Sequence, residues 1–172
     1  MESTHAGIGR FLIYSDKIRH DEVRRDLMYF VDRDKLEIKL AFMEKQLQLL
    51  KTNKDWDSAI EQAAFERVAH TVIEAVLDTG NAMIDGFIMR DPGSYEDIVD
   101  ILTDEKVIDL ELSDTLKKVI FYRKMLVQQY EAVNHREILD VFTEELPLLE
   151  TFPHKVRDYL INELGPISAF GK

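Results

Sequence analysis

The chain contains 172 residues, the length of one ordinary domain, which is enough to bury a hydrophobic core without disulfide bonds or a structural metal. Its 33 acidic and 22 basic residues give a net charge of −11, and this negative potential disfavours broad, non-specific binding of nucleic acids. The absence of cysteine excludes a disulfide scaffold, a thiolate zinc site and a cysteine nucleophile, and no apolar run is long enough to span a membrane, so we expect a cytoplasmic protein.

The first 27 residues differ from the rest of the chain, because five acidic and five basic residues leave them neutral. Two interpretations of residues 1–27 stay open. In the first, residues 1–27 lie upstream of the true start of translation, which is Met28, because two AGG codons at Arg24-Arg25 would spell a ribosome-binding site just before it. Alternatively, they form a helical arm that packs on the bundle or on a partner. We expect residues 28–172 to form one helical domain.

Two amphipathic helices are predicted in the first half of this domain. Asp32 is a suitable N-cap for the first helix, in which apolar residues recur at four-and-three spacing until Asn53. The second helix runs from Asp57 to about Met89 and has a wider apolar face. We therefore expect it at the centre of a bundle.

Three further helices are predicted in the second half. A cluster of turn-forming residues precedes a short helix that Asp91 or Ser94 can cap. Ser113 is the expected cap of a fourth helix that reaches about Tyr130, and Asn134 is the expected cap of the last helix. The last helix is expected to be interrupted by two prolines and stopped by a Gly-Pro pair, namely Pro147, Pro153 and Gly165-Pro166. Together these elements predict an all-α fold, an antiparallel up-and-down bundle of four to five helices.

One cation lies where the fourth helix should be apolar. Arg123 shares a four-and-three seam with Leu116, Val119 and Leu126, and an unpaired charge on a buried seam would be very costly. The long helix carries a polar stripe, so we predict a carboxylate–arginine pair between the two helices. The stripe consists of Glu74, Asp78, Asn81 and Asp85. Its oxygens also suit a divalent cation, but a solvated or arginine-pairing face is the favoured interpretation, and no metal is expected.

The segments around these residues resemble a known family. The fourth helix is similar to the signature of HepT-like proteins in the HEPN superfamily, with the residues Phe121-Tyr122-Arg123-Lys124-Met125-Leu126-Val127-Gln128-Gln129-Tyr130. Three more stretches resemble the Bacillus YutE-type branch of that family, namely Glu74-Ala75-Val76-Leu77-Asp78-Thr79-Gly80-Asn81, Tyr95-Glu96-Asp97-Ile98 and Gly165-Pro166-Ile167-Ser168-Ala169-Phe170. The resemblance covers residues 28–172.

The resemblance implies an antiparallel helical bundle that forms a homodimer, with two motifs facing each other across a cleft. In active members it implies an RNA endonuclease that needs no metal and no cofactor. It also implies a toxin–antitoxin pair, in which a small nucleotidyltransferase antitoxin of the MntA type adenylylates the motif tyrosine, here Tyr130.

The motif departs from the family pattern at two positions. That pattern is Arg, four to six residues, then His, with Asn usually after the Arg and Tyr two residues past the His. Arg123 and Tyr130 match it, but Lys124 replaces the Asn and Gln128 replaces the His. An amide cannot perform the proton transfer that an imidazole performs, so we expect a weakened ribonuclease. The alternative is a non-catalytic helical module that binds a protein partner.

Other candidate residues are assigned simpler roles. His70, His135 and His154 are interpreted as structural, although His135 is also a candidate for a displaced imidazole just beyond the motif. A basic cluster on the fourth helix is interpreted as a solvated helix flank in preference to a local RNA footprint. This cluster consists of Lys117, Lys118, Arg123 and Lys124.

Overall fold

The computed structural model describes residues 31–164 as an all-α fold, as the sequence predicts. The helices are α2 (Arg33–Thr52), α3 (Ala59–Gly86), α4 (Tyr95–Asp104), α5 (Leu110–Phe121), α6 (Arg123–Gln128), α7 (His135–Leu149) and α8 (Phe152–Leu164), with a 3-10 helix η2 (Tyr130–Ala132) between α6 and α7. The interpretations of residues 1–27, of Met28 and of Gly165-Pro166 fall outside the described residues. Within that range, no helix has the length and hydropathy needed to cross a membrane.

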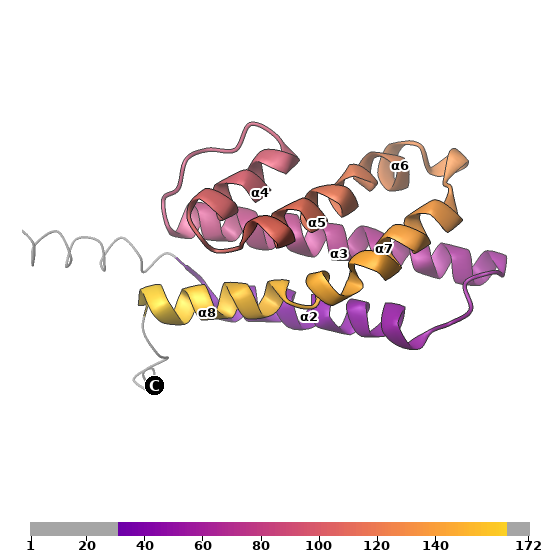
Figure 1. Ribbon diagram of the computed structural model, residues 1–172, viewed down its shortest axis with the longest axis horizontal. Coiled ribbons are helices and arrows are strands. Elements are labelled where there is room, and N and C mark those ends of the chain that lie inside the picture. The colour runs from indigo at the N-terminus through magenta and orange to yellow at the C-terminus, as the bar shows by residue number, and fades with distance from the viewer. Residues whose placement is uncertain (1–30, 165–172) are drawn as a thin grey trace, which may run out of the picture.

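The helices form four antiparallel arms along the long axis of the molecule (Figure 1). Helix α2 runs in one direction and α3 returns beside it. The third arm consists of α5 and α6, and the fourth of α7 and α8, while the short α4 packs against α3 and α5. The predicted up-and-down bundle is therefore confirmed, with two of its arms divided into two helices each.

Local sequence explains where the first two arms begin. The Asp32 carboxylate accepts a hydrogen bond from the Lys35 backbone N–H at 3.1 Å, which caps α2 as predicted. Helix α3 begins at Ala59, two residues later than expected, and ends at Gly86 instead of near Met89. Ser58 caps it, and the Glu61 side chain bonds back to the Ser58 N–H at 2.9 Å to complete a capping box.

The third arm differs from its prediction at both ends. Asp109, not Ser113, caps α5 by accepting the Leu112 backbone N–H at 3.0 Å, and Ser113 is buried inside the helix. The arm also does not run unbroken to Tyr130, because it breaks at Tyr122. There the backbone N–H bonds to Val119 in a tightened turn, and the buried phenol donates to Glu137 of α7 at 2.9 Å. Burial, together with that bond, raises the pKa of the Tyr122 hydroxyl.

The fourth arm is interrupted where the prolines predict it. Asn134 caps α7 by accepting the Glu137 N–H at 3.3 Å, as expected. Pro147 lies inside α7, which ends two residues later, and Pro153 lies in the first turn of α8, where its missing N–H costs least.

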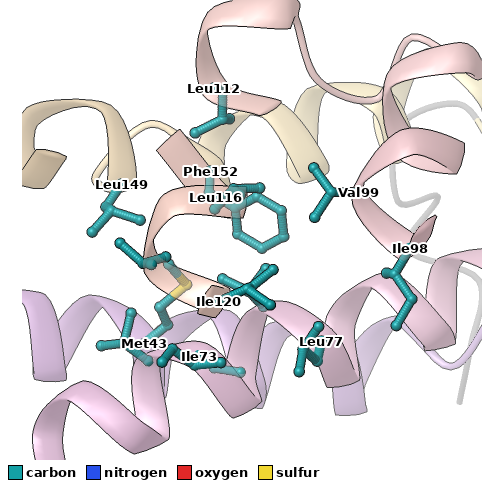
Figure 2. Packing of buried hydrophobic residues seen from close by; sticks show 14 of the residues in the cluster. Met43, Ile73, Leu77, Ile98, Val99, Leu112, Leu116, Ile120, Leu149 and Phe152 are labelled. Atoms are coloured by element: carbon teal, nitrogen blue, oxygen red, sulfur yellow. The ribbon is translucent and has the colours of Figure 1, made fainter. Parts of the chain in front are cut away.

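Large side chains from all four arms meet in one hydrophobic core (Figure 2). Met43 of α2 and Ile73 and Leu77 of α3 lie across from residues of the other arms, among them Leu116 and Phe152. Gly80 of α3 permits the close approach of α4, because a Cβ at that position would overlap the Ile98 side chain. The core therefore fixes α3 against α4 and α5.

We expect Phe142→Ala to lower the free energy of unfolding by about 3–5 kcal/mol, because the ring is fully buried and packs edge-on against Phe65 with 6.4 Å between centroids. Phe121→Ala is the matched control, since its ring is 70% exposed, and it should cost less than about 1 kcal/mol. Urea unfolding followed by circular dichroism measures both. Equal losses in the two variants would contradict this assignment of the core.

Candidate functional site

The candidate site is built around Arg123, the first residue of α6. Its Nε donates to Glu74 Oε1 of α3 at 2.7 Å, and only a fifth of its side chain is exposed. The hydrogen bond to Glu74 raises the pKa of Arg123, while partial burial opposes that rise. The predicted pairing of Arg123 with a carboxylate of the long helix is therefore present in the structure.

Tyr95, the first residue of α4, forms a second contact with the guanidinium. Arg123 Cζ lies 4.3 Å from the centroid of the Tyr95 ring, a cation–π geometry. Tyr95 as a whole is 46% exposed, so solvent reaches this side of the site. Glu74, Tyr95 and Arg123 thus join α3, α4 and α6 at one place.

A clip at the start of α4 holds Tyr95 in position. Both oxygens of Asp97 bind the Arg90 guanidinium, at 2.8 and 2.6 Å, and one of them also accepts the Gly93 backbone N–H at 2.7 Å. Ser94 caps the same turn by accepting the Asp97 N–H at 3.1 Å. The clip orders the loop that leads into α4, and with it the residue that packs against Arg123.

The predicted acidic stripe does not act as one unit. Only Glu74 contacts Arg123, whereas Asp78 forms an ion pair with Lys39 of α2 at 2.5 Å. Asn81 and Asp85 are exposed, further along α3. Across residues 31–164, no group of three or more His, Asp or Glu side chains is arranged to hold a metal ion.

The other motif residues, Gln128 and Tyr130, follow Arg123 in the chain and do not contact it. Gln128 is the last residue of α6 and is exposed, and Tyr130 begins η2 with 70% of its surface exposed. Since α6 is helical from Arg123 to Gln128, their side chains leave the helix axis about 140° apart. The structure therefore does not bring the Gln128 amide to the guanidinium.

Two histidines lie against carboxylates of α3. His70 Nε2 is 3.4 Å from Glu74 Oε1, the same oxygen that Arg123 binds, and His135 Nε2 is 2.5 Å from Glu66 Oε1. The sequence alone does not single out His70 or Tyr95 as site residues. The i,i+4 spacing of His70 and Glu74 is a signal for the first, whereas nothing local in the sequence connects Tyr95 with Arg123.

The basic cluster is largely neutralised by neighbouring carboxylates. Lys117 pairs with Asp100 at 2.5 Å, and Lys118 pairs with the buried Glu145, which Thr115 also binds. Arg123 has Glu74 as its partner, and Lys124 is exposed. These pairs favour the interpretation as a solvated flank and leave little free positive charge for a phosphate backbone.

Comparison with known proteins identifies the family. A family model described as "Ribonuclease HepT-like" matches residues 40–156, a span that contains Glu74, Tyr95 and the whole motif from Arg123 to Tyr130. The chain belongs to the HepT-like family. It is 54% identical over 143 residues to a Bacillus subtilis (strain 168) protein named "Putative RNase YutE", an alignment that covers 83% of this chain and 99% of the relative.

Solved structures show the same fold. The structure of YutE from Bacillus subtilis, described as a cytosolic protein, matches with a TM-score of 0.79 and 53% identity, over 82% of this chain and 99% of that one. A tri-AMPylated Shewanella oneidensis HEPN toxin in complex with an MNT antitoxin matches with a TM-score of 0.61 at 21% identity, over 77% of this chain and 98% of that one. The resemblance to HepT-like proteins and to the YutE-type branch is confirmed, and the distant match supports the HEPN fold.

The clip at α4 predicts an unusually acidic aspartate. The Arg90 guanidinium and then the Gly93 N–H lower the pKa of Asp97 from 3.8 to about 2. A carboxyl whose folded pKa is depressed stabilises the protein above its unfolded pKa, so this contribution is lost as the pH falls from about 3.8 towards 2. We expect a carboxyl-carbon NMR titration to place the Asp97 midpoint near 2.

Arg90→Ala should move that midpoint back up towards 3.8, because it removes the largest cause of the shift. A wild-type midpoint at 3.8 would show that the clip is not formed in solution.

Proposed function

We propose that this chain is the toxin-like component of a HEPN/nucleotidyltransferase toxin–antitoxin pair and acts in the cytoplasm as a metal-independent RNA endonuclease with weakened activity. The observation that carries the proposal is the Arg123 guanidinium, which Glu74 holds through Nε in a chain of the ribonuclease HepT-like family. The distant structural relative described as an AMPylated HEPN toxin with an MNT antitoxin supports the biological setting.

Arg123 supplies electrostatic stabilisation in this proposal. Cleavage of an RNA strand by its own 2′-hydroxyl passes through a phosphorane that carries extra negative charge. Glu74 engages Nε of Arg123, and within residues 31–164 the two terminal nitrogens make no hydrogen bond. Those nitrogens are thus available to bind phosphate oxygens in the forked geometry that guanidinium groups favour.

Gln128 limits the chemistry at the position where the family pattern has His. Its amide can donate and accept hydrogen bonds, but it neither takes up nor releases a proton near neutral pH. General acid–base catalysis contributes about 100-fold to 10,000-fold in rate, so the loss of an imidazole at this position weakens the enzyme.

Exposed apolar residues near the motif support a protein partner for this chain. Phe121 of α5 and Tyr130 of η2 are both 70% exposed and Val127 of α6 is 38% exposed, so several apolar side chains near the motif are open to a protein contact. We propose that a second copy of this chain or an MntA-like antitoxin covers them. The exposed Tyr130 hydroxyl is open to adenylylation by such an antitoxin.

The second candidate function is a non-catalytic interaction module. The same exposed apolar residues favour it, and so do Gln128 in place of the motif His and the net charge of −11. In this case the fold persists for binding a protein partner, and the remaining motif residues serve only the structure.

RNA cleavage in EDTA separates the two functions. We expect slow cleavage by wild type and a loss of about 100-fold or more in Arg123→Ala, because the phosphorane loses its positively charged partner. Gln128→His should gain at least about tenfold, because in the proposed dimer an imidazole at position 128 faces the Arg123 site of the second copy. Lys45→Ala, which removes an exposed cation of α2, is the matched control and should change the rate less than about threefold. Gel analysis of a defined RNA, after each variant is shown to fold, measures all four.

Two outcomes would contradict the ribonuclease proposal. Cleavage that survives Arg123→Ala unchanged would mean that this site does not cut RNA. Silence from wild type would leave the interaction module, and activity that returns only in Gln128→His would show an intact scaffold that has lost its chemistry.

Tyr130 should be a site of adenylylation. We expect the mass of one or more AMP groups to be added when the protein is incubated with a matched nucleotidyltransferase and ATP, because the Tyr130 hydroxyl lies at an exposed position just past α6. Tyr130→Phe should prevent the addition, while Tyr159→Phe on α8 should not. Peptide mass spectrometry locates the group, and unmodified Tyr130 beside a demonstrably active transferase would reject the assignment.

A further inference from the structure

Helix α3 places an imidazole beside the guanidinium of the motif. Glu74 Oε1 lies 2.7 Å from Arg123 Nε and 3.4 Å from His70 Nε2. Arg123 Nε and His70 Nε2 can therefore be no further apart than the sum of these two distances. Arg123 and His70 belong to different helices, so only the fold brings them together.

The surroundings of His70 suit a proton-transfer group. Its side chain is 28% exposed and that of Glu74 is 34% exposed, so both can be reached from solvent. Glu74 Oε1 approaches Nε2 of His70 to 3.4 Å, and a carboxylate on that side favours a proton on Nε2 and leaves Nδ1 as the basic nitrogen. Within the described residues, neither ring nitrogen of His70 is taken up by a hydrogen bond.

We propose that His70 is the catalytic base of this chain and replaces the imidazole that the motif lacks at Gln128, an inference that rests on the proposed RNA cleavage. The second ring nitrogen of His70 accepts the proton of the RNA 2′-hydroxyl as the O2′–P bond forms and the P–O5′ bond breaks. The leaving O5′ takes a proton from water, and the imidazolium returns its proton to the hydroxide that remains. The products are a 2′,3′-cyclic phosphate and a 5′-hydroxyl, with no net proton change.

His135 is the rival imidazole, and its position disfavours it. It contacts Glu66, which precedes Glu74 by eight residues on α3. Eight helical residues span about 12 Å along the helix axis, whereas His70 contacts the same carboxylate oxygen as Arg123. One phosphate group bound by Arg123 is thus adjacent to His70 and remote from His135.

The test compares three histidines in the full-length protein. We expect His70→Ala and His70→Gln each to lower the single-turnover rate of RNA cleavage in EDTA by about 100-fold or more. His135→Ala and His154→Ala, the second on the exposed side of α8, should each change it less than about threefold. Added imidazole should restore cleavage by His70→Ala in proportion to its concentration, a readout that a merely structural role would not move.

Thermal melting monitors the fold of every variant. If His70→Ala melts early, His70→Gln carries the test, because its amide keeps a donor to Glu74 but cannot transfer a proton. Wild-type cleavage that depends on Arg123 and survives in His70→Gln, or the absence of imidazole rescue in a folded His70→Ala, would overturn the role of His70 and leave the ribonuclease proposal standing. A silent wild type would overturn both.

Discussion

The ion pair between Glu74 and Arg123 is the interaction on which the site depends. A charge on the inner face of a helical arm requires a partner, and Glu74 meets that requirement from the neighbouring α3. The pair thereby fixes the start of α6 against α3, and the Tyr95 ring completes the contact from α4. It also leaves the outer edge of the guanidinium directed away from Glu74. One side chain thus joins three helices and keeps donors for a ligand.

Much of the fold could be predicted from the sequence, because apolar spacing and capping residues are local signals. Asp32, Ser94 and Asn134 cap the helices that they were expected to cap. The third arm was predicted wrongly, because Asp109 precedes Ser113 and takes the capping position. Its break at Tyr122 depends on a contact with α7 that no local pattern reveals.

The site was predictable only in part, for the same reason. A buried-seam arginine beside a helix rich in carboxylates indicated a pair, and the structure contains it with Glu74. The sequence could not tell which carboxylate would be used, because that choice depends on how α6 is placed relative to α2 and α3. Asp78 lies one turn further along α3 but pairs with Lys39 of α2. The positions of α2 and α6 around α3, and not the spacing of the carboxylates along α3, decide which partner each carboxylate takes.

The break at Tyr122 separates α5, which supplies most of the third arm's core residues, from α6, which carries the motif and adds Leu126 to the core. Leu112, Leu116 and Ile120 of α5 are in the core, whereas Lys124 and Gln128 of α6 are exposed. Replacements at the two exposed positions therefore remove no core contact and carry little penalty in folding. A lineage with this architecture is free to exchange one chemistry for another, or to abandon it, while the same bundle continues to fold.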